Sequence, residues 1–576
     1  MAKANRGIAL KPYLEAIEEH CSKLSKTELV QLVLAMAKEE SAFGRELFLD
    51  KLKTLMPGKK VVKTALPDIE RLLEDVQALK ESIMERIESI ENGDYDALDD
   101  WDWKNADYDD EPEMISEEQL DDMEGLFHAA DSLFLNGDLL DSRRLYEALF
   151  DLLKEQDESD YVMPEPNIEI REERARYARC VWETSDGRSR LKEFADAMDI
   201  EPSFQFNIQK VDDNYPLLQD VMDAREQGIK GIQDFFPRWK KLLEKKGTGG
   251  RKASLLVEVV YFTSGLTGVE KLARKWGRTQ PYGYLYWLDR LRQEERWEEI
   301  IKTAKEALKL LKTGQAREKI SDYLTEAGRR AGDTAIVLEG WLEKFYSHPC
   351  DTNLKALLTE AIKQEQREES LAQVLDFYSR QKELSSIDES LYVKALLLAG
   401  DLENAWEIVK SDKNLGWSSH MSTGLVFGCI CTMAADFNEN AGTIRKLVTF
   451  YCENAYYHSA GTKDQADFLR DEIITGLRQN RLKPSGLKPF TEWAFMIGRN
   501  RVDGIVSNTH RSAYDRAAWV LVSLAEVYAA RGETQKVGSL FTEYCKVKYN
   551  RHSAFKREVK QVISESTLLR QSGNWI

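Results

Sequence analysis

Three cysteines and a histidine in the C-terminal part of the chain have the side-chain chemistry of zinc ligands. They are Cys429, Cys431, Cys452 and His458. Structural zinc sites use four cysteine or histidine ligands, in pairs held on turns. Residues two positions apart on a helix point in different directions, so Cys429 and Cys431 would chelate one ion poorly. The pattern instead favours small buried side chains in an apolar helix.

A second cluster of candidate ligands lies in an acidic stretch near residue 110. Asp107, Asp109, Glu111 and Glu118 fall at the first, third, fifth and twelfth positions of a calcium-binding loop. The sixth position of such a loop needs glycine for a sharp turn, but the chain has Pro112 there, which cannot adopt that conformation. We therefore expect neither calcium nor any other cofactor.

Catalytic patterns are weak in this sequence. Seven cysteines and seven histidines allow many pairings, such as His20 with Cys21, but no local sequence indicates an activated thiol. The segment "GTGGRKAS" (247–254) lacks the spacing of a phosphate-binding loop. We predict that the protein is not an enzyme and has no small-molecule substrate, with an enzyme of unrecognised site as the alternative.

Acidic and aromatic residues are concentrated together between residues 92 and 113. This segment holds ten carboxylates and one lysine, whereas residues 546–560 hold six lysines or arginines and one glutamate. A self-repelling, solvated linker explains the charge, whereas docking on a basic, partly apolar groove also explains the aromatic residues. We leave both interpretations open. The candidate partner-binding residues are Tyr95, Trp101, Trp103, Tyr108, Lys546, Lys548, Arg551, Lys556 and Arg557.

The elements that position these residues are predicted to be helices. Apolar residues recur at spacings of three and four in 68–90, with Asp68 as a plausible start and Asn92 as a plausible stop. The best candidate strand, "SLLVEVVYF" (254–262), has helical neighbours and is interpreted as a buried helix. The predicted fold class is all-α.

Helix pairs are joined by recurring glycine-acid turns. Amphipathic helices end at Gly137, Gly332, Gly400 and Gly532, and each glycine is followed by an acidic residue. Segment 291–310 has the same form without glycine. The pattern resembles tetratricopeptide-type repeats, but the intervals between these glycines are irregular. The sequence thus predicts a degenerate helix–turn–helix (TPR-like) repeat array with a small N-terminal helical domain.

Three stretches resemble the helical region that accompanies the zinc finger of bacterial SWIM proteins. They are "SKTELVQLVLAMAKEE" near the start and segments 127–153 and 524–555. The SWIM finger needs Cys-x-Cys followed by Cys-x-His. Cys429 and Cys431 match the first half, but Cys452 is followed by Glu453 and Asn454, so the finger is absent.

Five segments are predicted. They are an N-terminal helical domain (1–91), an acidic aromatic linker (92–115), a helical-repeat body (116–410), a loop-rich hinge (411–443) and a C-terminal helical domain (444–576). Glycine, asparagine and serine in the hinge indicate an exposed, protease-accessible chain. The candidate positions are Gly416, Ser418, Met421, Gly424, Asn438 and Asn440.

The leading functional hypothesis is a non-enzymatic protein that binds and regulates a protein partner. The net charge of −18 argues against nucleic acid as the partner, and the longest nearly apolar run (425–435) is too short to span a membrane. Scattered cysteines and a start without a signal peptide favour the cytoplasm. In length and helical character the chain is also similar to the helical target of the type III-E CRISPR caspase-like protease. That similarity implies a proteolytically processed regulator in bacterial antiviral defence as an alternative.

Overall fold

The fold is entirely helical in the part of the chain that can be described. The computed structural model describes residues 10–39, 52, 68–92, 115–157, 168–200, 214–413, 415–416, 421–453, 463–572 and 575. Every regular element in these residues is a helix, so the predicted all-α class is confirmed. Contacts divide the chain into two compact units, Met1–Trp287 (unit 1) and Leu288–Ile576 (unit 2).

Unit 1 begins with two helices and continues through a four-helix core. Its helices are α1 (Leu10–Ser22), α2 (Lys26–Glu39), α4 (Ile69–Glu91), α5 (Glu117–Asn136), α6 (Leu139–Asp157), α7 (Ile170–Thr184), α8 (Arg190–Ala197), α10 (Leu218–Asp223), α11 (Ile232–Lys246), α12 (Arg251–Trp276) and the short 3₁₀ helix η2 (Gly277–Thr279). Helix α13 (Tyr282–Gln293) crosses the boundary between the units.

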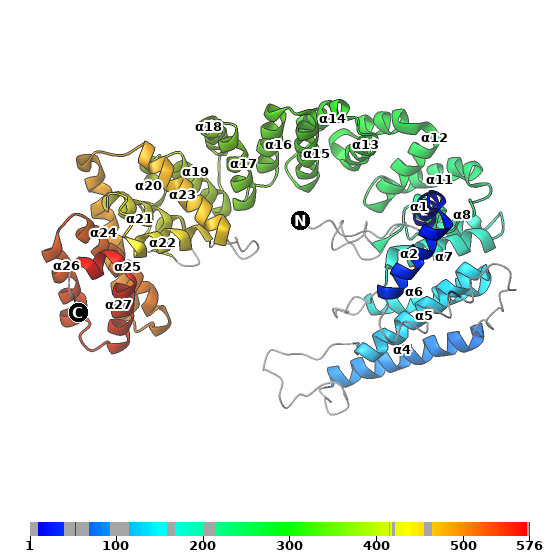
Figure 1. Ribbon diagram of the computed structural model, residues 1–576, viewed down its shortest axis with the longest axis horizontal. Coiled ribbons are helices and arrows are strands. Elements are labelled where there is room, and N and C mark those ends of the chain that lie inside the picture. Colours follow the sequence, from blue (N-terminus) through cyan, green and yellow to red (C-terminus); the bar gives the residue numbers. More distant parts are fainter. Residues whose placement is uncertain are drawn as a thin grey trace. The chain divides into compact units, whose positions relative to one another are not determined.

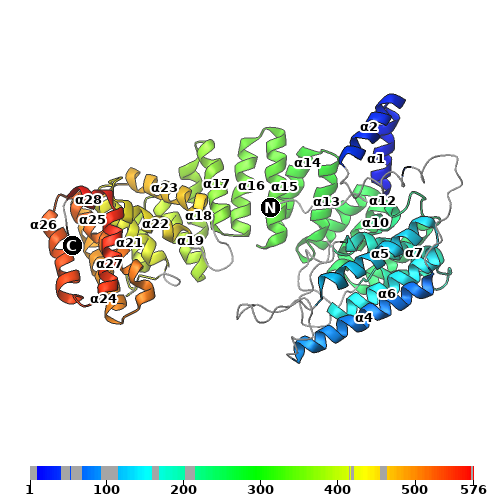
Figure 2. The ribbon, with the colours of Figure 1, turned by 60° about the horizontal axis from the view of Figure 1, so that its bottom comes forward.

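Helices α4 to α7 pack side by side (Figure 2). Leu72, Val76, Leu79 and Ile83 are buried on one face of α4, at the helical spacing expected from the sequence. Asp68 caps this helix by accepting a hydrogen bond from the backbone N–H of Glu70 at 3.2 Å. Helix α4 therefore forms where the sequence predicts it, and it packs against α5 and α6.

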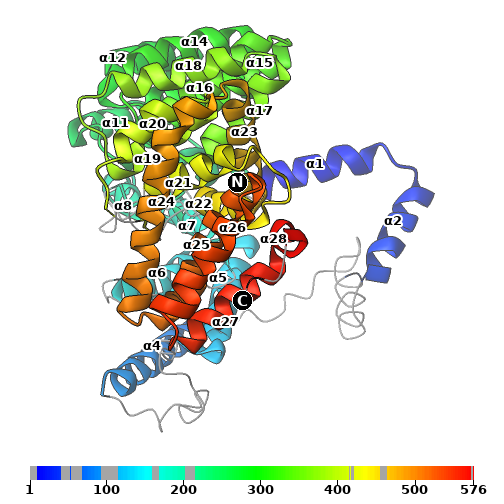
Figure 3. The ribbon, with the colours of Figure 1, turned by 90° about the vertical axis from the view of Figure 1, so that its left-hand side faces the viewer.

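Unit 2 contains successive helix pairs followed by a C-terminal bundle. Its helices are α14 (Trp297–Leu310), α15 (Gln315–Ala331), α16 (Thr334–Ser347), α17 (Asp351–Lys363), α18 (Arg367–Ser379), α19 (Ser386–Leu398), α20 (Leu402–Val409), α21 (Met421–Ala434), α22 (Gly442–Glu453), α23 (Lys463–Gln479), α24 (Pro484–Ser507), η3 (Arg511–Ala513), α25 (Tyr514–Ala530), α26 (Thr534–Phe541), the π-helix η4 (Thr542–Lys548), α27 (Ser553–Glu565) and α28 (Thr567–Ser572). Figure 1 shows the pairs from α14 to α20 following one another in chain order, and Figure 3 shows α24, α25 and α27 side by side.

The helix pairs of unit 2 are regularly spaced. The turns inside five consecutive pairs each contain a residue with positive φ, and these residues lie 37, 33, 35 and 36 positions apart. They are Glu295, Gly332, Glu365, Gly400 and Asp436, with φ of 54°, 70°, 58°, 77° and 58°. Because glycine marks only two of the five, the sequence intervals appear irregular. The structure thus shows a helical-repeat array that is more even than the sequence predicts.

The turns share one hydrogen-bond pattern even where glycine is missing. In the turn after α15, Gly332 N–H donates to Arg329 O at 3.2 Å and Asp333 N–H donates to Gly328 O at 2.9 Å. In the turn after α17, Glu365 N–H donates to Ile362 O at 3.1 Å, in the same pattern. This is a Schellman turn, whose left-handed residue is usually glycine. Glutamate can occupy the position, but its Cβ makes the conformation costly.

Replacing Glu365 with glycine is expected to stabilise unit 2. The left-handed conformation costs a residue with a Cβ about 1–2 kcal/mol, and glycine avoids most of this cost, so the free energy of unfolding should rise by about 1 kcal/mol. Glu368→Gly is the matched control, because this exposed residue lies in the first turn of α18 and should lose about 1 kcal/mol. Urea unfolding of both variants measures the difference. A loss of stability in Glu365→Gly would contradict this account of the turn.

The boundaries of the five predicted segments do not coincide with the boundary between the two units that contacts define. Helix α4, from the predicted N-terminal domain, packs against α5 and α6 from the predicted repeat body. The predicted body (116–410) also crosses the boundary at Trp287 and Leu288. The five boundaries stay a prediction, and the two units are used below.

Candidate partner-binding site

The predicted basic segment lies on η4 and α27 of unit 2. Helix α26 continues into η4, whose π-helical turns carry Lys546 and Lys548, and α27 carries Lys556, Arg557 and Lys560. π-Helical turns within helices are frequent at functional sites. The apolar side of α27 is anchored by Phe555, Val559 and Val562, which are buried, so its basic residues lie on the remaining faces.

The charges of three of these lysines act on one buried thiol. Burial raises the pKa of Cys545 to about 11, and the positive charges of Lys556, Lys546 and Lys560 oppose this rise. Among the described residues, none of the three has a carboxylate within ion-pair distance, although the Lys556 ammonium donates to Asn550 O at 2.7 Å. Like charges gathered in this way favour the approach of an anionic group. We call Lys546, Lys556 and Lys560 the lysine cluster.

Two other predicted cations are already paired. The Lys548 ammonium lies 3.2 Å from Asp503 Oδ2 and 3.1 Å from Glu543 Oε1. The Arg557 guanidinium lies 3.3 Å from Glu558 Oε1. Arg551 is exposed between η4 and α27. The structure therefore brings the predicted basic residues together but leaves only some of them available to a partner.

A shallow hollow of about 750 Å³ lies beside η4. Gly538 and Ser539 of α26 and Thr542 and Val547 of η4 line it, and Val547 is 68% exposed. Glu543 also lines the hollow, whereas no residue of the lysine cluster does. Val547 follows Lys546 in η4, so this surface combines apolar and charged side chains, as protein interfaces do. Tyr95, Trp101, Trp103 and Tyr108, the predicted acidic-segment residues, lie outside the described residues.

The structure corrects the predicted exposure at three of the protease-accessible positions. Met421 is only 8% exposed, Gly424 is buried inside α21, and Gly416 is also buried. A Cβ on Gly424 would lie 2.0 Å from the Tyr451 ring of α22. Glycine at this position permits close helix packing and does not mark a loop. Ser418 lies outside the described residues.

The other two predicted positions lie in the turn between α21 and α22. Asn440 is exposed and Asn438 is half-buried. The Asn438 side-chain oxygen accepts a hydrogen bond from Asn440 N–H at 2.9 Å, and Asn440 O accepts one from Leu568 N–H at 3.3 Å. Cleavage at these two residues stays a prediction.

Limited proteolysis is expected to spare α21. Proteases cut exposed chain that can open locally, and α21 is buried along almost its whole length. Any early cut between Met421 and Glu453 should therefore fall at 438–440. Mass spectrometry of fragments from brief digestion with a broad-specificity protease locates the cut, and an early cut within 421–434 would contradict the packing of α21.

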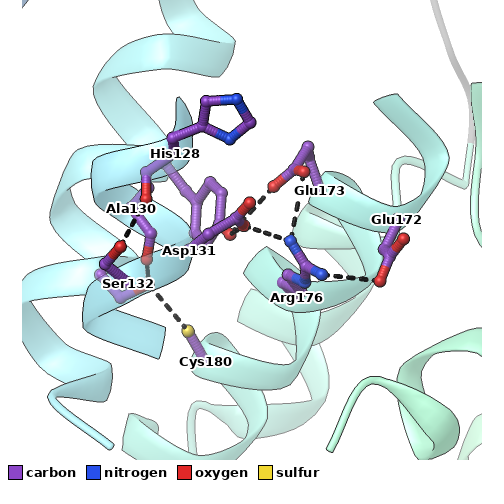
Figure 4. Close-up of polar contacts among 10 residues, drawn as sticks. His128, Ala130, Asp131, Ser132, Glu172, Glu173, Arg176 and Cys180 are labelled. Carbon is purple, nitrogen blue, oxygen red and sulfur yellow. Dashed lines mark hydrogen bonds and ion pairs between the residues drawn. The ribbon is translucent and has the colours of Figure 1, made fainter. Parts of the chain in front are cut away.

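A buried polar cluster in unit 1, which the sequence did not predict, has the most perturbed carboxylate. Figure 4 shows Asp131 of α5 and Glu173 and Arg176 of α7 pointing toward one another. The Tyr146 hydroxyl lies 2.5 Å from Asp131 Oδ1 and 3.0 Å from Glu173 Oε2. The Arg176 guanidinium contacts Asp131, and it lies 3.3 Å from Glu173 Oε1 and 2.7 Å from Glu172 Oε1.

Glu173 holds its proton more tightly in the folded protein than a solvent-exposed glutamate does. Burial and its hydrogen bond to the Asp131 carboxylate raise the pKa of Glu173 to about 9. Burial also raises the pKa of Tyr146. Two carboxyl groups that share a proton stay together without mutual repulsion. A perturbed carboxylate can also mark a functional site, but every contact described for this cluster joins α5, α6 and α7, so its role is to hold these helices together.

The stability of unit 1 is expected to fall as the pH rises from about 5 to about 9. The folded state keeps the Glu173 proton that the unfolded chain releases near pH 4.5, so raising the pH penalises the folded state. Glu173→Gln should flatten this slope, because an amide can still donate to Asp131 but cannot ionise. Glu147→Gln, at an exposed position of α6 outside the cluster, is the control. Thermal unfolding across this pH range would contradict the assignment if Glu173→Gln and the wild type kept equal slopes.

Neither metal nor membrane sites are found in the described residues. No three His, Cys, Asp or Glu side chains there are grouped so that they could hold a metal ion. Cys429, Cys431 and Cys452 are buried, and burial raises the pKa of each, to about 12 for Cys452. His458, the fourth candidate zinc ligand, lies outside the described residues. None of the described helices combines the length and apolar character that crossing a lipid bilayer requires.

Comparison with known proteins gives little guidance. No known protein family matches the sequence, and no curated protein is significantly similar to it. Among solved structures, a circular tandem repeat protein with novel repeat topology and enhanced subunit contact surfaces matches 88% of this chain and 98% of its own length. The identity is 10% and the TM-score is 0.16.

Proposed function

We propose that the chain is a non-enzymatic helical-repeat protein that binds and regulates a protein partner through an acidic surface of that partner. The observations that support this proposal are the lysine cluster of η4 and α27 and the exposed Val547, which follows Lys546 in η4. Positive charge attracts and orients an acidic partner, while the apolar surface contributes binding energy once water is excluded. Stacked helix pairs are a fold type that offers extended binding surfaces.

A protein partner fits the chain better than nucleic acid. The net charge of −18 opposes binding to a polyphosphate, because affinity for nucleic acid comes largely from neutralised phosphates. The non-enzymatic part of the proposal is supported by the state of the buried thiols. Burial raises the pKa of Cys180 to about 12 and that of Cys545 to about 11, so both are protonated, and a protonated thiol is a weak nucleophile.

Proteolytic processing is the second candidate function. The exposed Asn440 and Glu439, in the turn between two buried helices, favour it. A cut there would separate the repeat pairs before α22 from the C-terminal helices. A processed regulator of a type III-E CRISPR system would have this property, and the limited proteolysis described above tests for it.

The leading function is tested by capturing the partner from host extract with the wild-type chain, a charge-reversed test variant and a charge-reversed control. The tagged full chain is incubated with extract of its native host, and bound proteins are identified by mass spectrometry. The test variant carries Lys546→Glu, Lys556→Glu and Lys560→Glu. The control carries Lys309→Glu, Lys382→Glu and Lys483→Glu at three exposed lysines elsewhere in unit 2.

The expected result is one acidic partner that the wild type and the control retain and the test variant loses. A partner retained equally by all three would move the binding site away from the lysine cluster. Specific turnover of a small molecule by the purified chain, with no retained partner, would overturn the proposed function.

A further inference from the structure

A hollow of about 230 Å³ lies beside the turn between α21 and α22 in unit 2. Apolar side chains form part of its wall, among them Phe437 from the turn, Ile444 from α22 and Ile474 from α23. Two arginines, Arg445 and Arg478, and two acidic residues, Glu439 and Asp471, also line it, and Asp471 pairs with Arg445. Sites for drug-sized ligands are usually about 300–1,000 Å³. This smaller hollow is therefore suited to a single side chain of a partner.

The backbone beside the hollow is strained at two consecutive residues. Asp436 has φ 58° and Phe437 has φ 53°. Asp436 is the left-handed residue of its Schellman turn. Such a turn needs only one left-handed residue, and Phe437 is a second left-handed residue that the turn does not require. Each costs about 1–2 kcal/mol relative to a right-handed conformation. Backbone strain of this kind persists only where the surrounding structure enforces the conformation, and it is often found at functional sites.

The strain places an aromatic ring in the wall. Phe437 N–H donates to Thr432 O at 2.9 Å, which fixes the backbone after the turn. The Phe437 ring then lies beneath the guanidinium of Arg478, with 5.4 Å between the guanidinium carbon and the ring centroid. Stacking of this kind orients an arginine while leaving its N–H groups free to donate.

Arg478 differs from the neighbouring arginines in having no acidic partner. The Arg445 guanidinium lies 3.2 Å from Asp471 Oδ1, and the Arg481 guanidinium contacts Asp436. Among the described residues, no carboxylate lies within ion-pair distance of Arg478. An oriented, exposed guanidinium above an aromatic wall is complementary to a carboxylate that approaches with an apolar neighbour.

We propose that this hollow is a docking pocket for an acidic segment of the protein partner. An aromatic side chain of that segment enters between Phe437 and Ile474, and a neighbouring carboxylate pairs with Arg478. The inference rests on the proposed function and adds to it a second contact point with defined chemistry, besides the lysine cluster. Anchoring of one aromatic residue in a pocket flanked by charge pairs is a common pattern of interface hot spots.

The test uses the purified full chain and short labelled peptides. The probe is the dye-labelled peptide Asp-Asp-Tyr-Asp-Asp with blocked ends, and its binding is followed by fluorescence anisotropy up to millimolar peptide. Peptides with alanine in place of tyrosine, and with lysine in place of each aspartate, separate the apolar and charged contributions. The protein variants are Arg478→Glu and Thr475→Trp, which would fill the hollow from an exposed position of α23.

The matched control is Arg380→Glu. Arg380 is exposed, lies at the C-terminal end of α18 in unit 2, and among the described residues pairs with Asp376 of that helix, whose side chain is 53% exposed. The wild type and Arg380→Glu are expected to bind the tyrosine peptide equally. Arg478→Glu should weaken binding about tenfold or more, and Thr475→Trp should weaken it while the charge stays unchanged. Circular dichroism confirms that the variants keep their helix content.

Two results would overturn the inference. One is equal binding of the tyrosine peptide to the wild type, Arg478→Glu and Thr475→Trp, and the other is no binding to the wild type at any concentration. Equal binding of the tyrosine and alanine peptides would show that no aromatic side chain enters the hollow, which also contradicts the proposal. Failure of the pocket is separable from failure of the proposed function: the partner is then captured equally by the wild type and Arg478→Glu.

Discussion

Replacing Asp351 with alanine is expected to lower the free energy of unfolding of unit 2 by about 3–5 kcal/mol. The Asp351 carboxylate lies 2.6 Å from the Lys394 ammonium, and their side chains are only 5% and 3% exposed. Asp351 is also the first residue of α17, where a negative charge is favoured by the helix dipole. Removing the carboxylate leaves the Lys394 charge buried without its partner.

A double variant distinguishes the cost of leaving a buried charge unpaired from the cost of losing packed side-chain atoms. Asp351→Leu with Lys394→Met replaces both charges by apolar groups, and such replacements are often neutral or stabilising. The double variant should therefore unfold at a higher urea concentration than Asp351→Ala. A loss below about 1 kcal/mol in Asp351→Ala, in the range of exposed pairs, would show that the pair is not buried in solution.

Replacing Gly476 with valine is the second change with a large expected effect. A Cβ on Gly476 would lie 2.1 Å from Leu398 O and 3.1 Å from Gly400 N, which are backbone atoms and cannot rotate away. Helices α19 and α23 would have to separate, at a cost of about 3 kcal/mol or more.

Gly504→Ala is the control for this effect. Gly504 lies inside α24, and a Cβ there would meet nothing within 4 Å. Alanine should raise the free energy of unfolding by up to about 1 kcal/mol, because glycine is a poor helix former. Thermal unfolding of the two variants should thus shift in opposite directions. A shift in the same direction would contradict the close contact of α19 with α23.

The helices could be predicted from the sequence because each carries its own periodic signal. The predicted start at Asp68 and stop at Asn92 agree with α4, and segment 254–262 lies in α12 as a buried helix. The glycine turns at Gly332 and Gly400 were also correctly placed between helices. All these features depend on residues close together in the chain.

The regular repeat could not be predicted, because three of its turns use acidic residues. Glu295, Glu365 and Asp436 adopt left-handed conformations that an acidic residue does not signal in a sequence. Their positions are over-determined by the packing of the helix pairs on either side.

The candidate sites depend on contacts between distant segments. Phe437 and Arg478 meet only because the turn after α21 packs against α23. The burial of Gly424 could not be predicted for the same reason. The glycine- and serine-rich sequence around it indicates a loop, and only the fold places the Tyr451 ring against Gly424. The basic character of 546–560 was visible in the sequence, but the pairing of Lys548 with Asp503 was not.

Hydrogen exchange of the full chain, alone and with its captured partner, tests the central claim most directly. Binding through the lysine cluster and the pocket should slow amide exchange in η4, at the start of α27 and in the turn between α21 and α22. The rates within the buried helix α21 should stay unchanged, because these amides are already protected. Slower exchange confined to unit 1, or no change in unit 2, would contradict partner binding at these surfaces.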